Sequence, residues 1–215
     1  MRSRTVSLLL GLVLGVGAVS GCTSGGDGGG TDATTVVAAP WAREITTGEV
    51  MWTVSQGGWT LTAHDMGRGE ARRDSYFSDD TTGEPLVKKG DPIVFVNVVA
   101  TNTSETTMFV GTDEPGLWAM PMDSPYTQGV VGVAPASDGQ MTDHGVWYHS
   151  RRTGAEESSP FTVAPGESFA MGFVLPLVLG EKGEWVFVPT LWVHETKETV
   201  IGDELVFERQ SYTFP

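Results

Sequence analysis

Apolar and polar residues follow each other along most of this chain in short segments bounded by turn residues. Residues 50–54 and 59–63 are β-branched and aromatic segments that flank Gln56, Gly57 and Gly58, a pattern typical of a β-hairpin. Residues 93–100 form the longest apolar run of this region, interrupted only by Asn97. A strand that is apolar on both faces belongs in the middle of a covered sheet, so this run predicts a central strand.

Further short segments of the same kind follow, and none has a convincing 3.6-residue repeat. A Pro165-Gly166 turn spans residues 164–167. The remaining expected strands are residues 107–110, 118–120, 146–148, 161–163, 168–175, 185–188, 191–194 and 205–208. Many short strands with regular turns predict an all-β fold, an antiparallel β-sandwich over residues 41–215.

The N-terminus has a different pattern. Arg2 and Arg4 precede an apolar run at residues 6–19, about the length of the apolar part of a signal peptide and too short for a comfortable membrane span. Residues 1–21 are therefore expected to be a signal peptide, and the Gly/Ser/Thr/Asp-rich residues 22–40 a flexible linker.

The end of this segment, Val19-Ser20-Gly21-Cys22, resembles the lipobox of bacterial lipoproteins. The resemblance implies cleavage between Gly21 and Cys22, attachment of diacylglycerol to the Cys22 thiol, and a place on the extracytoplasmic face of the cell membrane. The bilayer would then be a partner through diacylglyceryl-Cys22, because two acyl chains give stable anchoring where one does not. The alternative is an ordinary secretory signal with an incidental cysteine.

A second resemblance covers residues 59–189. The long apolar strand starts at Gly90-Asp91-Pro92 and ends at Asn102, and a later Pro165-Gly166-Glu167 turn precedes a strand that ends at Pro176. This pattern resembles the immunoglobulin-like domains of uncharacterised bacterial lipoproteins. The resemblance implies an immunoglobulin-like sandwich and carries no activity. Residues 111–142 depart from its compact pattern and are expected to form a long loop excursion.

Composition and charge narrow the possible partners. The formal net charge is -14, and removal of residues 1–21 takes away two arginines and no acid, so it becomes -16. Such a chain repels phosphate backbones, which argues against nucleic-acid binding. Seven Trp and nine Phe argue against disorder, and a single cysteine excludes an internal disulfide.

Catalytic motifs are lacking. The nearest approach to a serine-hydrolase turn, Gly166-Glu167-Ser168-Phe169-Ala170, lacks the second glycine and leads into a strand. The chain has no phosphate-binding loop, no dinucleotide fingerprint and no zinc-protease motif. We therefore expect neither an enzyme nor a bound cofactor.

Methionine and histidine offer a metal-binding alternative. His64 with Met66, and Met120 with Met122, each place two soft ligands on one side of an extended chain, which would suit copper(I). Methionine is more often a filler of cores. Residues 79–84 include Asp79, Asp80 and Glu84, whose carboxylate oxygens could bind calcium. Such a segment is more often a solvated loop.

Aromatic residues in the excursion and just beyond it give a candidate binding surface. These are Trp118, Tyr126, Trp147 and Tyr148. Loops on a rigid β scaffold are where binding sites are commonly built, but the same rings can simply hold the loop against the sandwich. The sequence thus predicts a membrane-anchored, non-catalytic module that binds an envelope protein or a small ligand, with a copper-binding lipoprotein as the alternative.

Overall fold

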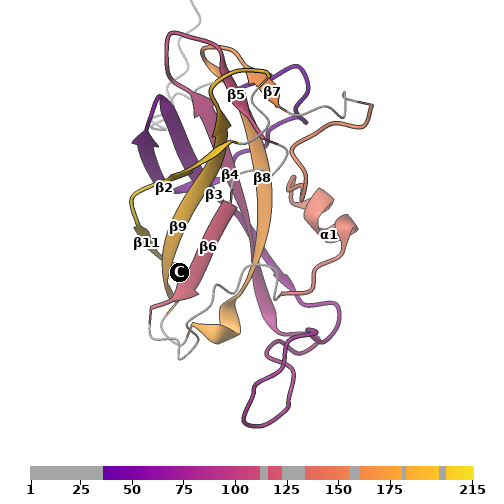
Figure 1. Ribbon diagram of the computed structural model, residues 1–215. Coiled ribbons are helices and arrows are strands. Elements are labelled where there is room, and N and C mark those ends of the chain that lie inside the picture. Colours follow the sequence, from indigo (N-terminus) through magenta and orange to yellow (C-terminus); the bar gives the residue numbers. More distant parts are fainter. Residues whose placement is uncertain (1–35, 112–115, 123–133, 155–159, 181–182, 199–201) are drawn as a thin grey trace, which may run out of the picture. The chain divides into compact units, whose positions relative to one another are not determined.

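The computed structural model describes residues 36–111, 116–122, 134–154, 160–180, 183–198 and 202–215, which form a two-layered β-sandwich with one short α-helix (Figure 1). The predicted signal peptide, the lipobox with Gly21 and Cys22, most of the linker, and Tyr126 lie outside the described residues. Residues 35–215 form one compact unit. The predicted all-β sandwich is confirmed.

The first sheet has the strand order β1-β8-β4-β3-β2. All its neighbours are antiparallel except β1 and β8, which are parallel. Its first strand lies inside the range 22–40 that the sequence assigned to the linker. The strands are β1 (Val37–Ala38), β2 (Glu49–Gln56), β3 (Trp59–Glu70), β4 (Pro92–Asn102) and β8 (Glu167–Pro176).

The second sheet is built around β9. Its order is β10-β9-β5-β7, and β6 and β11 also pair with β9. A short 3₁₀-helix, Leu177–Leu179, precedes β9. The strands are β5 (Met108–Val110), β6 (Gly116–Pro121), β7 (Phe161–Val163), β9 (Glu184–His194), β10 (Asp203–Val206) and β11 (Gln210–Thr213).

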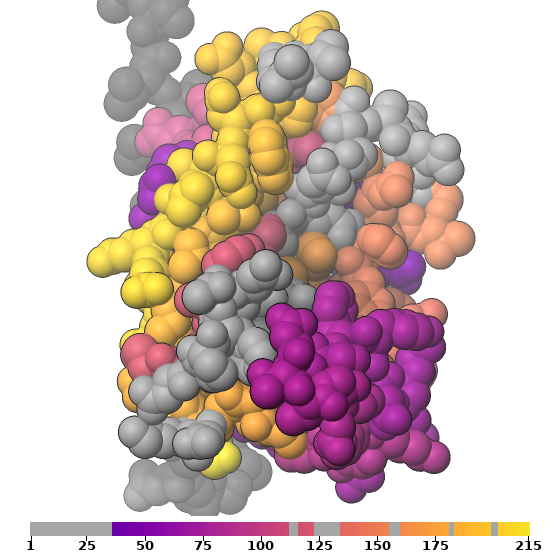
Figure 2. All heavy atoms as spheres, turned by 60° about the horizontal axis from the view of Figure 1, so that its bottom comes forward, coloured from indigo at the N-terminus to yellow at the C-terminus, as the bar shows by residue number. Residues whose placement is uncertain are grey.

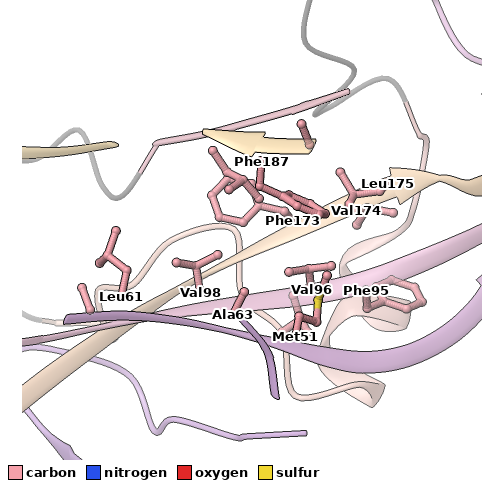
Figure 3. Packing of buried hydrophobic residues seen from close by; sticks show 14 of the residues in the cluster. Met51, Leu61, Ala63, Phe95, Val96, Val98, Phe173, Val174, Leu175 and Phe187 are labelled. Atoms are coloured by element: carbon pink, nitrogen blue, oxygen red, sulfur yellow. The ribbon is translucent and has the colours of Figure 1, made fainter. Parts of the chain in front are cut away.

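The hairpin and the central strand are as the sequence predicts. Gly57 and Gly58 have φ values of +59° and +79° and connect β2 to β3 as a two-residue turn that favours glycine at both positions. Strand β4 lies between β8 and β3. Its Val96 and Val98, together with Phe173 of the neighbouring β8, face Phe187 of the second sheet (Figure 3).

The expected strands at residues 185–188 and 191–194 are one strand, β9. Pro189 has no N–H to donate, so it predicts a break. The proline is tolerated because it lies where the partner of β9 changes from one strand to another. Strand β11 pairs with β9 up to Phe187, and β10 pairs with β9 from Thr190 onward. The Pro189 carbonyl still accepts a hydrogen bond from Phe207 N at 3.0 Å.

The expected strand at residues 146–148 is wrong. These residues follow helix α1 (Asp138–Asp143), which the sequence pattern did not predict. Ser137 Oγ accepts from Gln140 N, and Gln140 Oε1 accepts from Ser137 N, a reciprocal capping box that starts the helix. Six residues are too few to establish a 3.6-residue repeat. Within the described part of the chain, no helix has the length and apolarity needed to span a membrane.

Candidate functional site

The face of the first sheet that turns away from the second sheet is covered by a cap, which we define as residues 41–48 and 134–152. Figure 1 shows α1, part of this cap, on the side of β8 away from β9 and β6. The His144 ring stacks on Phe95 of β4 with centroids 4.1 Å apart. Gln140 Nε2 donates to Glu70 O at 2.9 Å, and Asn97 Nδ2 donates to Thr46 O at 2.8 Å. Both faces of β4 are therefore buried, which explains why its sequence from residue 93 to residue 100 is apolar except at Asn97.

Residues 146–147 close the cap onto β8. Gly172 N donates to Trp147 O at 2.7 Å. A Cβ atom at Gly172 would lie 2.0 Å from Val146 Cγ1 and 2.9 Å from both Trp147 N and Trp147 O. Glycine is thus required here for the close approach of the cap backbone.

The cap contains a pocket of about 260 Å³, which we call the α1 pocket. Met141 and Val146 provide its buried apolar surface. The other residues around it carry polar or charged groups: Arg43, Asp138, Thr142, Trp147, Tyr148 and His149. An apolar base with a few converging polar groups is typical of a small-molecule site.

Arg43 is held in the α1 pocket by an aromatic ring. Its guanidinium carbon lies 4.4 Å from the centroid of the Trp147 ring, within cation–π distance. Its backbone N donates to Ser150 O at 2.7 Å, and its Nε is buried without a hydrogen-bond partner. Within the described ranges the ion pairs are Arg68–Asp65 and Lys88–Glu84, so Arg43 is paired with none of the described carboxylates.

The pKa of the Tyr148 hydroxyl is shifted by burial and by nearby charges. Burial raises the pKa of its hydroxyl, the negative charge of Asp138 raises this pKa further, and Arg73 opposes the change. The Tyr148 hydroxyl is therefore neutral at physiological pH and can both donate and accept a hydrogen bond.

The structure brings together two of the predicted binding residues and separates a third. Trp147 and Tyr148 both line the α1 pocket. Trp118 lies on β6 in the second sheet, opposite Val188 of β9, with 51% of its surface exposed. Arg43 was missed because it precedes Trp147 by about a hundred residues and no local motif marks it. The Ser137–Gln140 capping box was the available signal for the helix that supplies Asp138 and Thr142.

The predicted metal ligands form two separate pairs. His64 and Met66 belong to β3 of the first sheet, whereas Met120 belongs to β6 of the second and Met122 follows it. His64 is 7% exposed, and its Nδ1 lies 3.1 Å from Gly48 O, a carbonyl to which a protonated Nδ1 donates. Burial lowers the pKa of His64, and the hydrogen bond to Gly48 opposes this. Among the described residues, no three or more His, Cys, Asp or Glu side chains are grouped to hold a metal ion.

The other candidate positions have structural roles. Ser168 is 1% exposed, and its Oγ lies 2.8 Å from Thr101 Oγ1 on the neighbouring strand. Asp79 Oδ1 accepts from Thr81 N and Thr82 N within the loop between β3 and β4. This loop forms the purple lobe of Figure 2 and exposes Tyr76 and Phe77.

Comparison with protein-family models, with curated proteins and with solved structures finds no match to this chain. Function is therefore inferred from the residues of the chain and their geometry.

Proposed function

We propose that this protein is a membrane-anchored lipoprotein whose immunoglobulin-like sandwich acts as a non-catalytic binding module, with the α1 pocket as its ligand site. The observation that carries the proposal is the Arg43 guanidinium, which stacks on Trp147 and is paired with no described carboxylate. A buried ion pair would leave nothing for a ligand to neutralise, whereas a cation held by a ring keeps its charge available.

The rigid setting of the pocket supports a binding role. Trp147 and Tyr148 directly follow Val146, which packs against Gly172 of β8. His144, just before them in the chain, stacks on Phe95 of β4. A site on a fixed scaffold loses little conformational entropy when a ligand binds. The proposal is non-catalytic because Ser168, the serine of the nearest approach to a hydrolase turn, is engaged in a contact within the sheet.

The location is proposed from the lipobox. Residues 19–22 combine an aliphatic residue, two small residues and the only cysteine of the chain, after a charged and then an apolar segment. A diacylglyceryl group on Cys22 would place the sandwich on the extracytoplasmic face of the cell membrane. The envelope proteins and small solutes of that compartment are then the available ligands.

Cys22→Ser is expected to abolish acylation, because the serine hydroxyl is not a substitute for the cysteine thiolate as the group that is alkylated. In cells fed labelled fatty acid, the wild-type protein should carry label and the variant should remain as an unlabelled precursor. Thr23→Ser is the matched control and should be labelled normally. Label on the Cys22→Ser protein would overturn the anchoring proposal.

The pocket itself can be tested through its tryptophan. In the mature lipidated protein in neutral detergent, the indole N–H resonance of Trp147 is assigned by its disappearance in Trp147→Phe. A screen of small polar fragments should shift this resonance and leave that of Trp118 unmoved, since Trp118 lies in the other sheet. If no fragment at millimolar concentration shifts Trp147, the α1 pocket is not the ligand site.

The copper alternative has less geometric support, because Met120 and Met122 do not lie in the same sheet as His64 and Met66. Stoichiometric copper in the purified mature protein would favour it over the α1 pocket.

A further inference from the structure

The α1 pocket contains two opposite charges that do not neutralise each other. Arg43 and Asp138 both line it. A salt bridge would require their nitrogen and oxygen atoms to lie within about 4 Å. The ion pairs among the described residues do not include either side chain. The two charged groups therefore line the same pocket without forming a salt bridge.

Arg43 is held in its position by its own contacts. Its guanidinium lies on the Trp147 ring, its Nε is buried, and its backbone is fixed by the hydrogen bond to Ser150 O. A planar guanidinium in a fixed position matches a carboxylate, which can accept two parallel hydrogen bonds from it.

Asp138 is fixed in turn by the helix. It directly follows Ser137, whose hydroxyl accepts from Gln140 N, and its carbonyl accepts from Thr142 Oγ1 at 2.8 Å. Its charge acts on the Tyr148 hydroxyl inside the same pocket. A carboxylate in this position favours an ammonium group and repels a second carboxylate.

We infer that the ligand of the α1 pocket is a small zwitterion, with its carboxylate on Arg43 and its ammonium group toward Asp138. This inference rests on the proposed function of the pocket. A simple anion would be repelled by Asp138, and a simple cation would be repelled by Arg43, whereas a zwitterion can satisfy both groups. The volume of about 260 Å³ lies below the range of drug-sized pockets, so the ligand has few heavy atoms.

The test uses three matched sets of probes on the mature lipidated protein. The zwitterions are the ω-amino acids from glycine to 6-aminohexanoate, which vary the separation of the two charges. The single-charge probes are the corresponding n-alkyl carboxylates and n-alkylamines. Affinity is measured by calorimetry, and the site is identified by the Trp147 indole resonance.

Two variants remove one charge each, Asp138→Asn with an isosteric amide and Arg43→Gln with a neutral amide on a shorter side chain. Arg43→Gln should weaken the best zwitterion and its matched carboxylate by about ten-fold or more and leave the amine unaffected or tighter. Asp138→Asn should weaken the zwitterion and the amine by a similar factor and spare the carboxylate. The controls are Arg152→Gln and Asp143→Asn, which change the same charges on exposed residues of the cap outside the pocket and should alter no affinity by more than about two-fold.

The outcomes separate the ligand class from the function. If neutral or singly charged fragments shift Trp147 and the best zwitterion binds no tighter than its single-charge analogues, the zwitterion inference is wrong and the pocket remains a ligand site. The zwitterion inference is also wrong if either Arg43→Gln or Asp138→Asn leaves zwitterion affinity unchanged. If no probe and no screened fragment shifts Trp147, the proposed function itself fails.

Discussion

Phe187→Ala is expected to lower the free energy of unfolding by about 3–5 kcal/mol, the usual cost of removing a buried aromatic ring from a core. Phe187 is fully buried on β9, the strand around which the second sheet is built. Its ring lies 5.9 Å from that of Trp52 of the first sheet and 6.5 Å from that of Trp185 (Figure 3 shows Phe187 beside Phe173). The alanine would leave a cavity between the two sheets that neither rigid layer can close.

Urea denaturation followed by circular dichroism measures this loss. Trp192→Ala is the control: it removes a larger ring from the same strand, but from the opposite face, where the ring is 37% exposed. The loss for Trp192→Ala should be clearly smaller than for Phe187→Ala. Equal losses, or a larger loss at Trp192, would mean that the core does not lie between the two sheets as described.

The parts of the fold that the sequence predicts are those with local signals. Two glycines between two β-branched segments specify the β2–β3 hairpin, since only glycine adopts positive φ twice in succession without strain. An apolar run interrupted only by Asn97 specifies β4, because both faces of this strand are buried. Each of these features depends on residues within one segment.

The predictions that were wrong concern features that depend on contacts between distant segments. Residues 146–148 have the composition of a strand, yet they pack across Gly172 as part of a cap. Pro189 predicts a break, yet β9 continues because the proline lies between two partner strands. Neither conformation can be predicted from the segment alone, because each is determined by the distant part of the chain that packs against the segment.

The candidate site shows the same division. Trp147 and Tyr148 were identified because aromatic residues in a long connection favour a surface site. Arg43, which gives the site its charge, comes from the start of the domain and reaches Trp147 only through the pairing of residue 43 with residue 150. Trp118 was grouped with Trp147 because both lie within or near one excursion, but β6 joins the second sheet and separates them.

Gly172→Ala is expected to lower the free energy of unfolding by about 2–4 kcal/mol and to eliminate ligand binding at the α1 pocket. The added methyl group would overlap Val146 Cγ1 and press on the backbone of Trp147. Strand β8 cannot yield, because it is paired with β4 along nine residue pairs from Thr101 to Ile93. Residues 146–147 must therefore move away and give up the hydrogen bond from Gly172 N to Trp147 O.

The consequence for the site follows from the same displacement, because Trp147 is the ring on which Arg43 rests. When that ring moves, the guanidinium loses its position, so the variant should lose zwitterion affinity even at temperatures where it is fully folded. Gly139→Ala is the matched control: it makes the same change within α1, where the nearest atom to the new Cβ is Ser137 Oγ at 3.8 Å. Alanine there should be neutral or stabilise the helix by up to about 1 kcal/mol. If Gly172→Ala unfolds like the wild type and its Trp147 indole resonance still shifts on zwitterion binding, the cap does not depend on close contact with β8. The α1 pocket would then lack the fixed geometry that its proposed function requires.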